Sequence, residues 1–162
     1  MRSAYALHEN RVTLGCFRVG TSFYALDVAQ LREVVRWQAP TPLPRAPRLI
    51  EGLIDLRGAV VPGVDLGRAL DAVPVQIGAS ARCAIVELDG LVMGLVVDAA
   101  EGVLSVEVGS LEDPPALTTH AGYEVVRAIV RRPDAPPVLL LSLEHVLESV
   151  YRSAMDPGEE AA

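Results

Sequence analysis

Side chains that could serve as catalysts or metal ligands are few in this chain and lie far apart. The three histidines, His8, His120 and His145, neither adjoin a cysteine nor belong to a Ser-centred GxSxG elbow. The two cysteines, Cys16 and Cys83, have no CxxC partner and no histidine at metal-ligand spacing. We therefore interpret the histidines as surface residues and the cysteines as buried thiols within strands.

Four acidic residues could be taken for paired catalytic carboxylates: Asp55, Asp65, Asp98 and Glu101. They fall at the ends of predicted strands and in turns, where acidic caps and turn formers are common. The glycines form neither GxGxxG nor GxxxxGK[ST] between a strand and a helix, so no phosphate cradle is predicted. The sequence thus predicts neither a hydrolytic pair nor a metal or other cofactor.

Charge and composition favour a protein partner. The formal net charge is −7 and the pI is near 4.9, so nucleic acid and anionic membrane surfaces are repelled at long range. Aromatic residues make up 4% of the chain, too few for a base-stacking platform. The first twelve residues are too short and polar for a signal peptide, and no apolar run reaches the roughly 18 residues of a membrane span. We expect a cytoplasmic protein without membrane insertion.

The first half of the chain predicts five strands and one helical turn. The strands are apolar runs at 12–19, 22–28, 31–37, 49–56 and 59–64. Gly20-Thr21 marks the first hairpin, and a cluster of prolines after Trp37 indicates an exposed, stiff loop. Asp65 is a suitable N-cap for a helical turn over Leu66–Leu70.

The second half repeats this pattern. Runs at 82–88 and 91–97 flank Asp89-Gly90, the strongest two-residue hairpin signal in the sequence. An offset of 69 residues places Tyr24–Val28 on Met93–Val97 and Val34-Val35 on Val103-Leu104, although chance similarity between Val-rich hairpins stays open. More loosely, Asp65–Leu70 corresponds to Ser142–Leu147, each a capping residue before an apolar-periodic turn.

The repeat predicts an all-β fold of two related five-stranded units. We interpret residues 12–152 as one domain whose units lie roughly at 12–78 and 79–152, with an uncertain boundary and strands that could be exchanged. Units of about 70 residues bury little surface alone, so the two should share an apolar seam with a groove along it. The segment 153–162 has little to bury and is predicted to be a disordered tail.

One segment, Ile50 to Leu66, has an arginine inside an otherwise apolar hairpin. Its order of Gly, apolar run, Leu-Arg-Gly, β-branched residues, Pro and Val-Asp-Leu resembles the signature of CheW-like domains, and the resemblance extends from about Leu14 to Leu147. It implies two SH3-like five-stranded β-barrels packed on each other, with short helical turns and a C-terminal helix. It also implies a non-enzymatic adaptor that joins the cytoplasmic tip of methyl-accepting chemoreceptors to the regulatory domain of a CheA-type histidine kinase.

The resemblance also selects candidate receptor-binding residues. Leu31, Glu33 and Val34 match the strand that family members use near the receptor groove, and Gly52 and Arg57 match a functionally sensitive glycine and arginine. The guanidinium group of an arginine can bind a carboxylate or a carbonyl at the end of a helix. Neighbouring apolar residues can cover the hydrophobic stripe of that helix. The alternative for Arg57 is a bond to local backbone or to Glu51 that only holds the barrel.

Three features depart from the family pattern: Arg127 where glycine is usual, the proline-rich loop 131–137, and Gly63 in place of an apolar residue. They leave open a divergent member that binds receptor or kinase but not both. A remote alternative is a small β-barrel enzyme with its site in the groove between the barrels.

Overall fold

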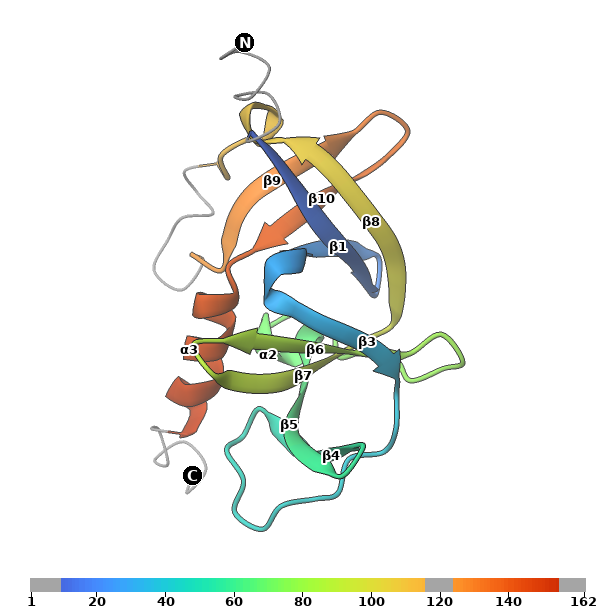
Figure 1. Ribbon diagram of the computed structural model, residues 1–162, viewed down its shortest axis with the longest axis vertical. Helices are drawn as coiled ribbons and strands as arrows, with labels where there is room; N and C mark the ends of the chain where they lie inside the picture. The colour runs from blue at the N-terminus through green and yellow to red at the C-terminus, as the bar shows by residue number, and fades with distance from the viewer. Residues whose placement is uncertain (1–9, 116–123, 155–162) are drawn as a thin grey trace.

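The computed structural model describes residues 10–115 and 124–154, and strands are its main element (Figure 1). In chain order the elements are β1 (Arg11–Val19), β2 (Ser22–Asp27), the 3₁₀ helix η1 (Val28–Gln30), β3 (Leu31–Arg36), β4 (Ile50–Leu56), β5 (Ala59–Asp65), α2 (Leu66–Ala69), β6 (Arg82–Leu88), β7 (Leu91–Val97), β8 (Ala99–Glu107), the 3₁₀ helix η2 (Val108–Ser110), β9 (Val126–Arg132), β10 (Ala135–Leu141) and α3 (Leu143–Ala154). The predicted strands are present within one or two residues, except that Val28 belongs to η1.

The strands form two five-stranded sheets of matching topology. The first sheet has the order β8-β1-β2-β10-β9 and the second β3-β6-β7-β5-β4. In each, an antiparallel hairpin occupies the centre, and its second strand pairs in parallel with a strand from outside the hairpin: β2 with the later strand β10, and β7 with the earlier strand β5. The internal repeat read from the sequence therefore corresponds to a repeated sheet topology.

The sheets do not coincide with the sequence halves 12–78 and 79–152. β3 follows β2 in the chain but pairs with β6 in the second sheet, and β8 follows β7 but pairs with β1 in the first. The two sequence halves thus each contribute strands to both sheets. As a result the second sheet is one continuous stretch, Leu31 to Val97, set between the strands of the first.

Each sheet closes on itself into a barrel. After β3 the chain returns to β4, where Thr41 and Leu53 exchange two backbone hydrogen bonds of 2.8 Å. The same closure occurs in the first sheet, where Glu112 and Ile129 exchange bonds of 3.0 and 2.8 Å. Closure leaves fewer unpaired backbone groups at the sheet edges. We call these the first and the second barrel.

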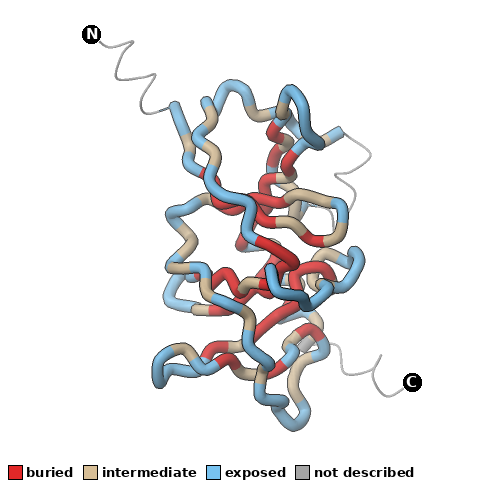
Figure 2. The backbone as a smooth tube through the Cα atoms, turned by 90° about the vertical axis from the view of Figure 1, so that its right-hand side faces the viewer, coloured by how far each residue is buried: buried red, intermediate tan, exposed pale blue. Residues whose placement is uncertain are grey.

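Buried side chains form three clusters, one in each barrel and one between them. Figure 2 marks the buried residues in red along the backbone. The interior of the first barrel includes Leu14 and Leu140, and that of the second includes Ile54 and Ile85. The largest cluster is the predicted apolar seam, where residues of both barrels meet buried side chains of α3, such as Val146. Burial of apolar surface contributes roughly 25 cal/mol per Å² to stability. The seam therefore stabilises the contact between the two barrels.

Two predicted helix caps differ in the length of the helix that follows. The Asp65 carboxylate accepts from the Arg68 backbone N–H at 3.0 Å, which confirms the N-cap of α2. At α3 the Ser142 hydroxyl accepts from the His145 backbone N–H at 3.3 Å. α3 ends at Ala154, so residues 153 and 154, which the sequence assigns to the tail, are helical. The rest of the predicted tail, residues 155–162, lies outside the described residues. His8 and His120 lie outside them as well.

Both cysteines should react slowly with thiol reagents in the native protein. Cys16 and Cys83 are buried in different barrels, with 3% and 1% of their surface exposed. Burial raises the pKa of both thiols, that of Cys83 to about 12, so little reactive thiolate forms near neutral pH. Labelling with a chromogenic disulfide should be slow in buffer and fast in denaturing urea. Equal rates in both solutions would contradict the strand placement.

Candidate functional site

The candidate residues centre on β3, an edge strand of the second sheet beside the seam (Figure 1). Its side chains alternate in exposure along LREVVR: Arg32, Val34 and Arg36 are exposed, whereas the residues between them are half-buried. Successive side chains of a strand point to opposite faces. Val34 therefore lies on one face of β3, and Glu33 lies on the other.

Val34 and Leu31 are placed near the seam in different ways. Val34 is 42% exposed and pairs in register with Ala84, a buried member of the seam cluster. Leu31 packs against that cluster and approaches the backbone of Gly15 so closely that a Cβ there would lie 2.6 Å from its Cδ1. Leu31 thus contributes packing, while Val34 offers apolar surface at the rim of the seam.

Arg57 and Glu33 form an ion pair that connects the two edges of the second sheet. Arg57 lies in the β4–β5 turn at φ +52°, with Gly58 at φ +90°, and its Nη2 is 2.5 Å from Glu33 Oε2 on β3. The arginine side chain is 72% exposed and the glutamate 31%. The alternative partner, Glu51, is instead bonded to Arg68 at 3.1 Å. Two of the five candidate residues therefore bind each other.

The ion pair changes the titration of both groups. The hydrogen bond from Arg57 lowers the pKa of Glu33, and the bond to Glu33 raises the pKa of Arg57. Because the folded-state pKa of Glu33 is depressed, its stabilising contribution is present above the unfolded-state pKa and is lost as pH falls through the folded value. Exposure to solvent keeps this contribution small.

Replacing Arg57 with Ala should raise the pKa of Glu33 toward its ordinary value, because the hydrogen bond is the largest cause of the depression. The matched variant Arg32→Ala removes a weaker electrostatic contribution and should raise this pKa less. The measurement is an NMR titration of the Glu33 side-chain carboxyl in the three proteins. An unchanged titration in Arg57→Ala would show that the two side chains are not paired in solution.

Gly52 has a structural role in β4. It is buried, has φ +154°, and a Cβ at this position would lie 2.3 Å from the Thr41 carbonyl oxygen. Thr41 is the residue whose backbone pairs with Leu53 to close the second barrel. Only glycine at position 52 lets the chain after β3 approach the backbone of β4 this closely.

The departure at Gly63 is explained by the same part of the barrel. Gly52 pairs with Gly63, and Gly63 pairs with Gly94, so three glycines lie side by side on neighbouring strands. A Cβ on Gly63 would lie 2.7 Å from Ile54 Cδ1, and one on Gly94 would lie 3.0 Å from the same atom. The glycines therefore make room for the fully buried Ile54 side chain.

The other two departures lie on the surface of the first barrel. Arg127 is exposed on β9. The predicted loop 131–137 is instead the end of β9, a turn at residues 133–134 and the start of β10, and residues 133–137 are all exposed. The guanidinium of Arg132 lies 4.7 Å from the centre of the Phe23 ring, which anchors the end of β9 beside this turn. Neither departure disturbs the barrel interior.

The structure brings together only some of the predicted site. Glu33 and Arg57 are in contact, Val34 faces away from them, Leu31 packs at the seam, and Gly52 is buried. Sequence reasoning missed Arg32 and Arg36, the exposed neighbours of Val34 on its face, of which Arg32 pairs with Glu87 at 3.4 Å. The alternation of the LREVVR segment could have identified them.

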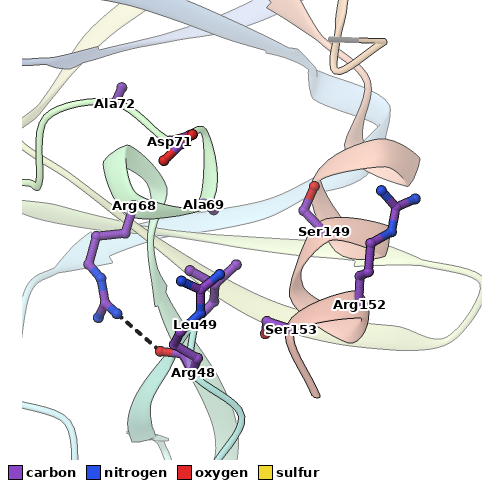
Figure 3. A pocket seen from close by; sticks show the side chains of 9 residues that line it. All are labelled: Arg48, Leu49, Arg68, Ala69, Asp71, Ala72, Ser149, Arg152 and Ser153. Atoms are coloured by element: carbon purple, nitrogen blue, oxygen red, sulfur yellow. Dashed lines mark hydrogen bonds between the residues drawn. The ribbon is translucent and has the colours of Figure 1, made fainter. Parts of the chain in front are cut away.

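Two pockets lie outside this surface. The larger, of about 520 Å³, lies between α2 and α3 (Figure 3) and is lined by Arg48, Leu49, Arg68, Ala69, Asp71, Ala72, Ser149, Arg152 and Ser153. Arg68 bonds the Arg48 carbonyl and Glu51, and Arg152 bonds Glu148, so carboxylates already balance much of its positive charge. The smaller pocket, of about 260 Å³, lies at one end of the second barrel.

The described residues hold no set of three or more His, Cys, Asp or Glu side chains that could ligate a metal ion. Within the same ranges, no helix is long and apolar enough to span a membrane. The fold and the candidate residues define a double-barrel β protein whose distinguishing surface is an exposed edge strand beside an apolar seam.

The chain belongs to the CheW-like domain family, which matches residues 13–151. It is 28% identical over 138 residues to a chemotaxis protein CheW of Rhizobium meliloti, covering 85% of this chain and 88% of the relative. It is 29% identical to protein FrzA of Myxococcus xanthus, covering 86% and 88%. The crystal structure of the scaffolding protein TtCheW from Thermoanaerobacter tengcongensis has a TM-score of 0.75 and 30% identity, covering 85% of this chain and 92% of that one. These matches confirm the predicted family and fold class.

Proposed function

We propose that this chain is a non-enzymatic cytoplasmic adaptor that couples the cytoplasmic tip of methyl-accepting chemoreceptors to the regulatory domain of a CheA-type histidine kinase. Support comes from relatives named as chemotaxis and scaffolding proteins, which the chain matches over most of their length.

The observation that carries the receptor part of the proposal is the exposed face of β3. Val34 presents apolar surface at the rim of the seam, between the exposed arginines Arg32 and Arg36. An amphipathic helix has an apolar stripe flanked by charged residues. The exposed face of β3, with an apolar side chain between two charged ones, is complementary to such a helix. On this proposal Val34 contacts the helix directly, while Leu31, Gly52 and the Glu33–Arg57 pair keep the edge of the barrel in shape.

The kinase part of the proposal places the regulatory domain at the barrel ends, away from the exposed face of β3. Because Val34 lies on a strand edge beside the seam, a helix there would leave the far ends of both barrels accessible. An adaptor of this kind can hold two partners at once without competition between them.

The test is co-sedimentation of the purified protein with a receptor cytoplasmic fragment alone, with the kinase alone, and with both. Coupling predicts binding in each pair and a ternary complex in the third mixture. Binding of one partner only would support the divergent member that the sequence left open. Binding of neither partner would contradict the proposed function.

A further inference from the structure

The smaller pocket, at one end of the second barrel, combines apolar walls with carboxylates. It is lined by Trp37, Pro40, Glu51, Asp65, Val75, Ile77 and Val96. These residues come from the chain after β3, the start of β4, the ends of β5 and β7, and the segment 71–77. Ile77 is 47% exposed although it is aliphatic, so the pocket presents apolar surface to solvent.

The wall formed by the segment 71–77 is held in place by two buried carboxylates. Asp65 accepts from the Val75 backbone N–H at 3.0 and 3.2 Å, and Asp98 accepts from the Gln76 N–H at 3.1 Å. On the opposite wall, the Trp37 backbone N–H donates to the Ala81 carbonyl at 3.3 Å. Because both walls are fixed by hydrogen bonds, a ligand would bind without first ordering the pocket.

The charge of this pocket is negative. The lining residues contribute two carboxylates, Glu51 and Asp65, and no cation. The neighbouring Arg68 binds Glu51 Oε2 at 3.1 Å, which balances one of these charges and leaves Glu51 Oε1 without a hydrogen bond to any residue that the structure describes. The whole chain has a net charge of −7, so a cationic ligand is attracted at both short and long range.

We propose that this pocket binds an arginine side chain presented by a protein partner. A guanidinium group stacks on an indole face and can donate to a carboxylate, while its alkyl stem packs on aliphatic walls. Trp37, Glu51 and the pair Val75 and Ile77 supply these three surfaces in one pocket. A lysine would lack the planar fork, and an acidic side chain would meet like charge. This inference does not depend on the receptor surface at β3.

The experiment uses the fluorescence of Trp37, which is the only tryptophan in the sequence. The probes are the peptides acetyl-Gly-Arg-Gly-amide and acetyl-Gly-citrulline-Gly-amide, which have nearly the same shape but differ in charge. The arginine peptide should change the fluorescence saturably with a Kd of the order of 1 mM. The citrulline peptide should bind at least about fivefold more weakly, because it lacks the charge-assisted bond.

Two variants of equal charge change complete the test. Glu51→Gln keeps the shape of the pocket and should weaken binding of the arginine peptide about fivefold. Glu87→Gln alters an exposed glutamate on β6 that pairs with Arg32, and it should leave the Kd unchanged. Thermal unfolding verifies that both variants fold. Equal binding of the two peptides, no saturable change, or equal effects of the two variants would overturn the proposal, and none of these results would bear on coupling of receptor and kinase.

Discussion

Gly52→Ala should lower the free energy of unfolding by about 3 kcal/mol or more, through backbone strain and overpacking. The alanine would have to adopt φ +154°, and its Cβ would lie 2.3 Å from the Thr41 carbonyl oxygen. Neither group can move freely, because Thr41 is held to Leu53 by two backbone hydrogen bonds. Urea denaturation monitored by circular dichroism measures the loss.

The matched control is Gly102→Ala. Gly102 also has a positive φ, +93°, but nothing lies within 4 Å of a Cβ built on it. This variant carries backbone strain without the steric clash and should lose only about 1–2 kcal/mol. Similar losses for the two variants would show that contact with Thr41 is not what requires glycine at position 52. If Gly52→Ala is as unstable as expected, receptor and kinase binding should fall together.

Val34→Asp should weaken receptor binding about tenfold or more, equivalent to about 1.4 kcal/mol or more. In the proposed complex the carboxylate would be buried without a partner against the apolar stripe of a helix. In the free protein the side chain is 42% exposed, so thermal stability should change little. Kinase binding should also change little, because the barrel ends are left intact. Affinity for a receptor fragment, affinity for the kinase and the melting temperature are measured side by side.

Val108→Asp is the control for this prediction. Val108 is 46% exposed, close to the value for Val34, but it lies in η2 of the chain that closes the first barrel. It should leave receptor affinity unchanged. A parallel loss of affinity for receptor and kinase in Val34→Asp, together with a lower melting temperature, would assign Val34 to the fold instead of the receptor surface.

The features that sequence predicted well are those set by local chemistry. Asp89-Gly90 forms a turn with φ of +51° and +83°, values that few residue pairs other than Asn-Gly and Asp-Gly adopt easily. Asp65 caps α2 through its own side chain. The repeat was visible because Tyr24–Asp27 and the matching residues Met93–Val96 belong to equivalent strands, β2 and β7. Each of these signals spans only a few neighbouring residues.

The features that sequence did not predict depend on which distant strands meet. Nothing within β3 or β8 indicates that each pairs with the hairpin of the other repeat. The partner of Arg57 was missed for the same reason, because Glu33 comes within reach only when β3 and β4 approach each other in a closed barrel. Gly52 was selected as a binding residue, whereas its environment is the backbone of the chain that closes this barrel.

The insertion of the second barrel between strands of the first has a mechanical consequence. The two barrels are joined by two covalent tethers, one at η1 and one at Asp98. The first tether begins at the end of β2, which pairs with Leu14 of β1, and the second ends at the start of β8, which pairs with Arg18 of β1. Leu14 and Arg18 are four residues apart, so the two tethers meet the first barrel at points separated by roughly 13 Å, given the rise per residue of a strand. A single tether would act as a swivel, whereas two separated tethers resist twisting of one barrel against the other. Load applied to one barrel would therefore pass to the other as torque, and molecules bound to the two barrels would keep a fixed mutual orientation.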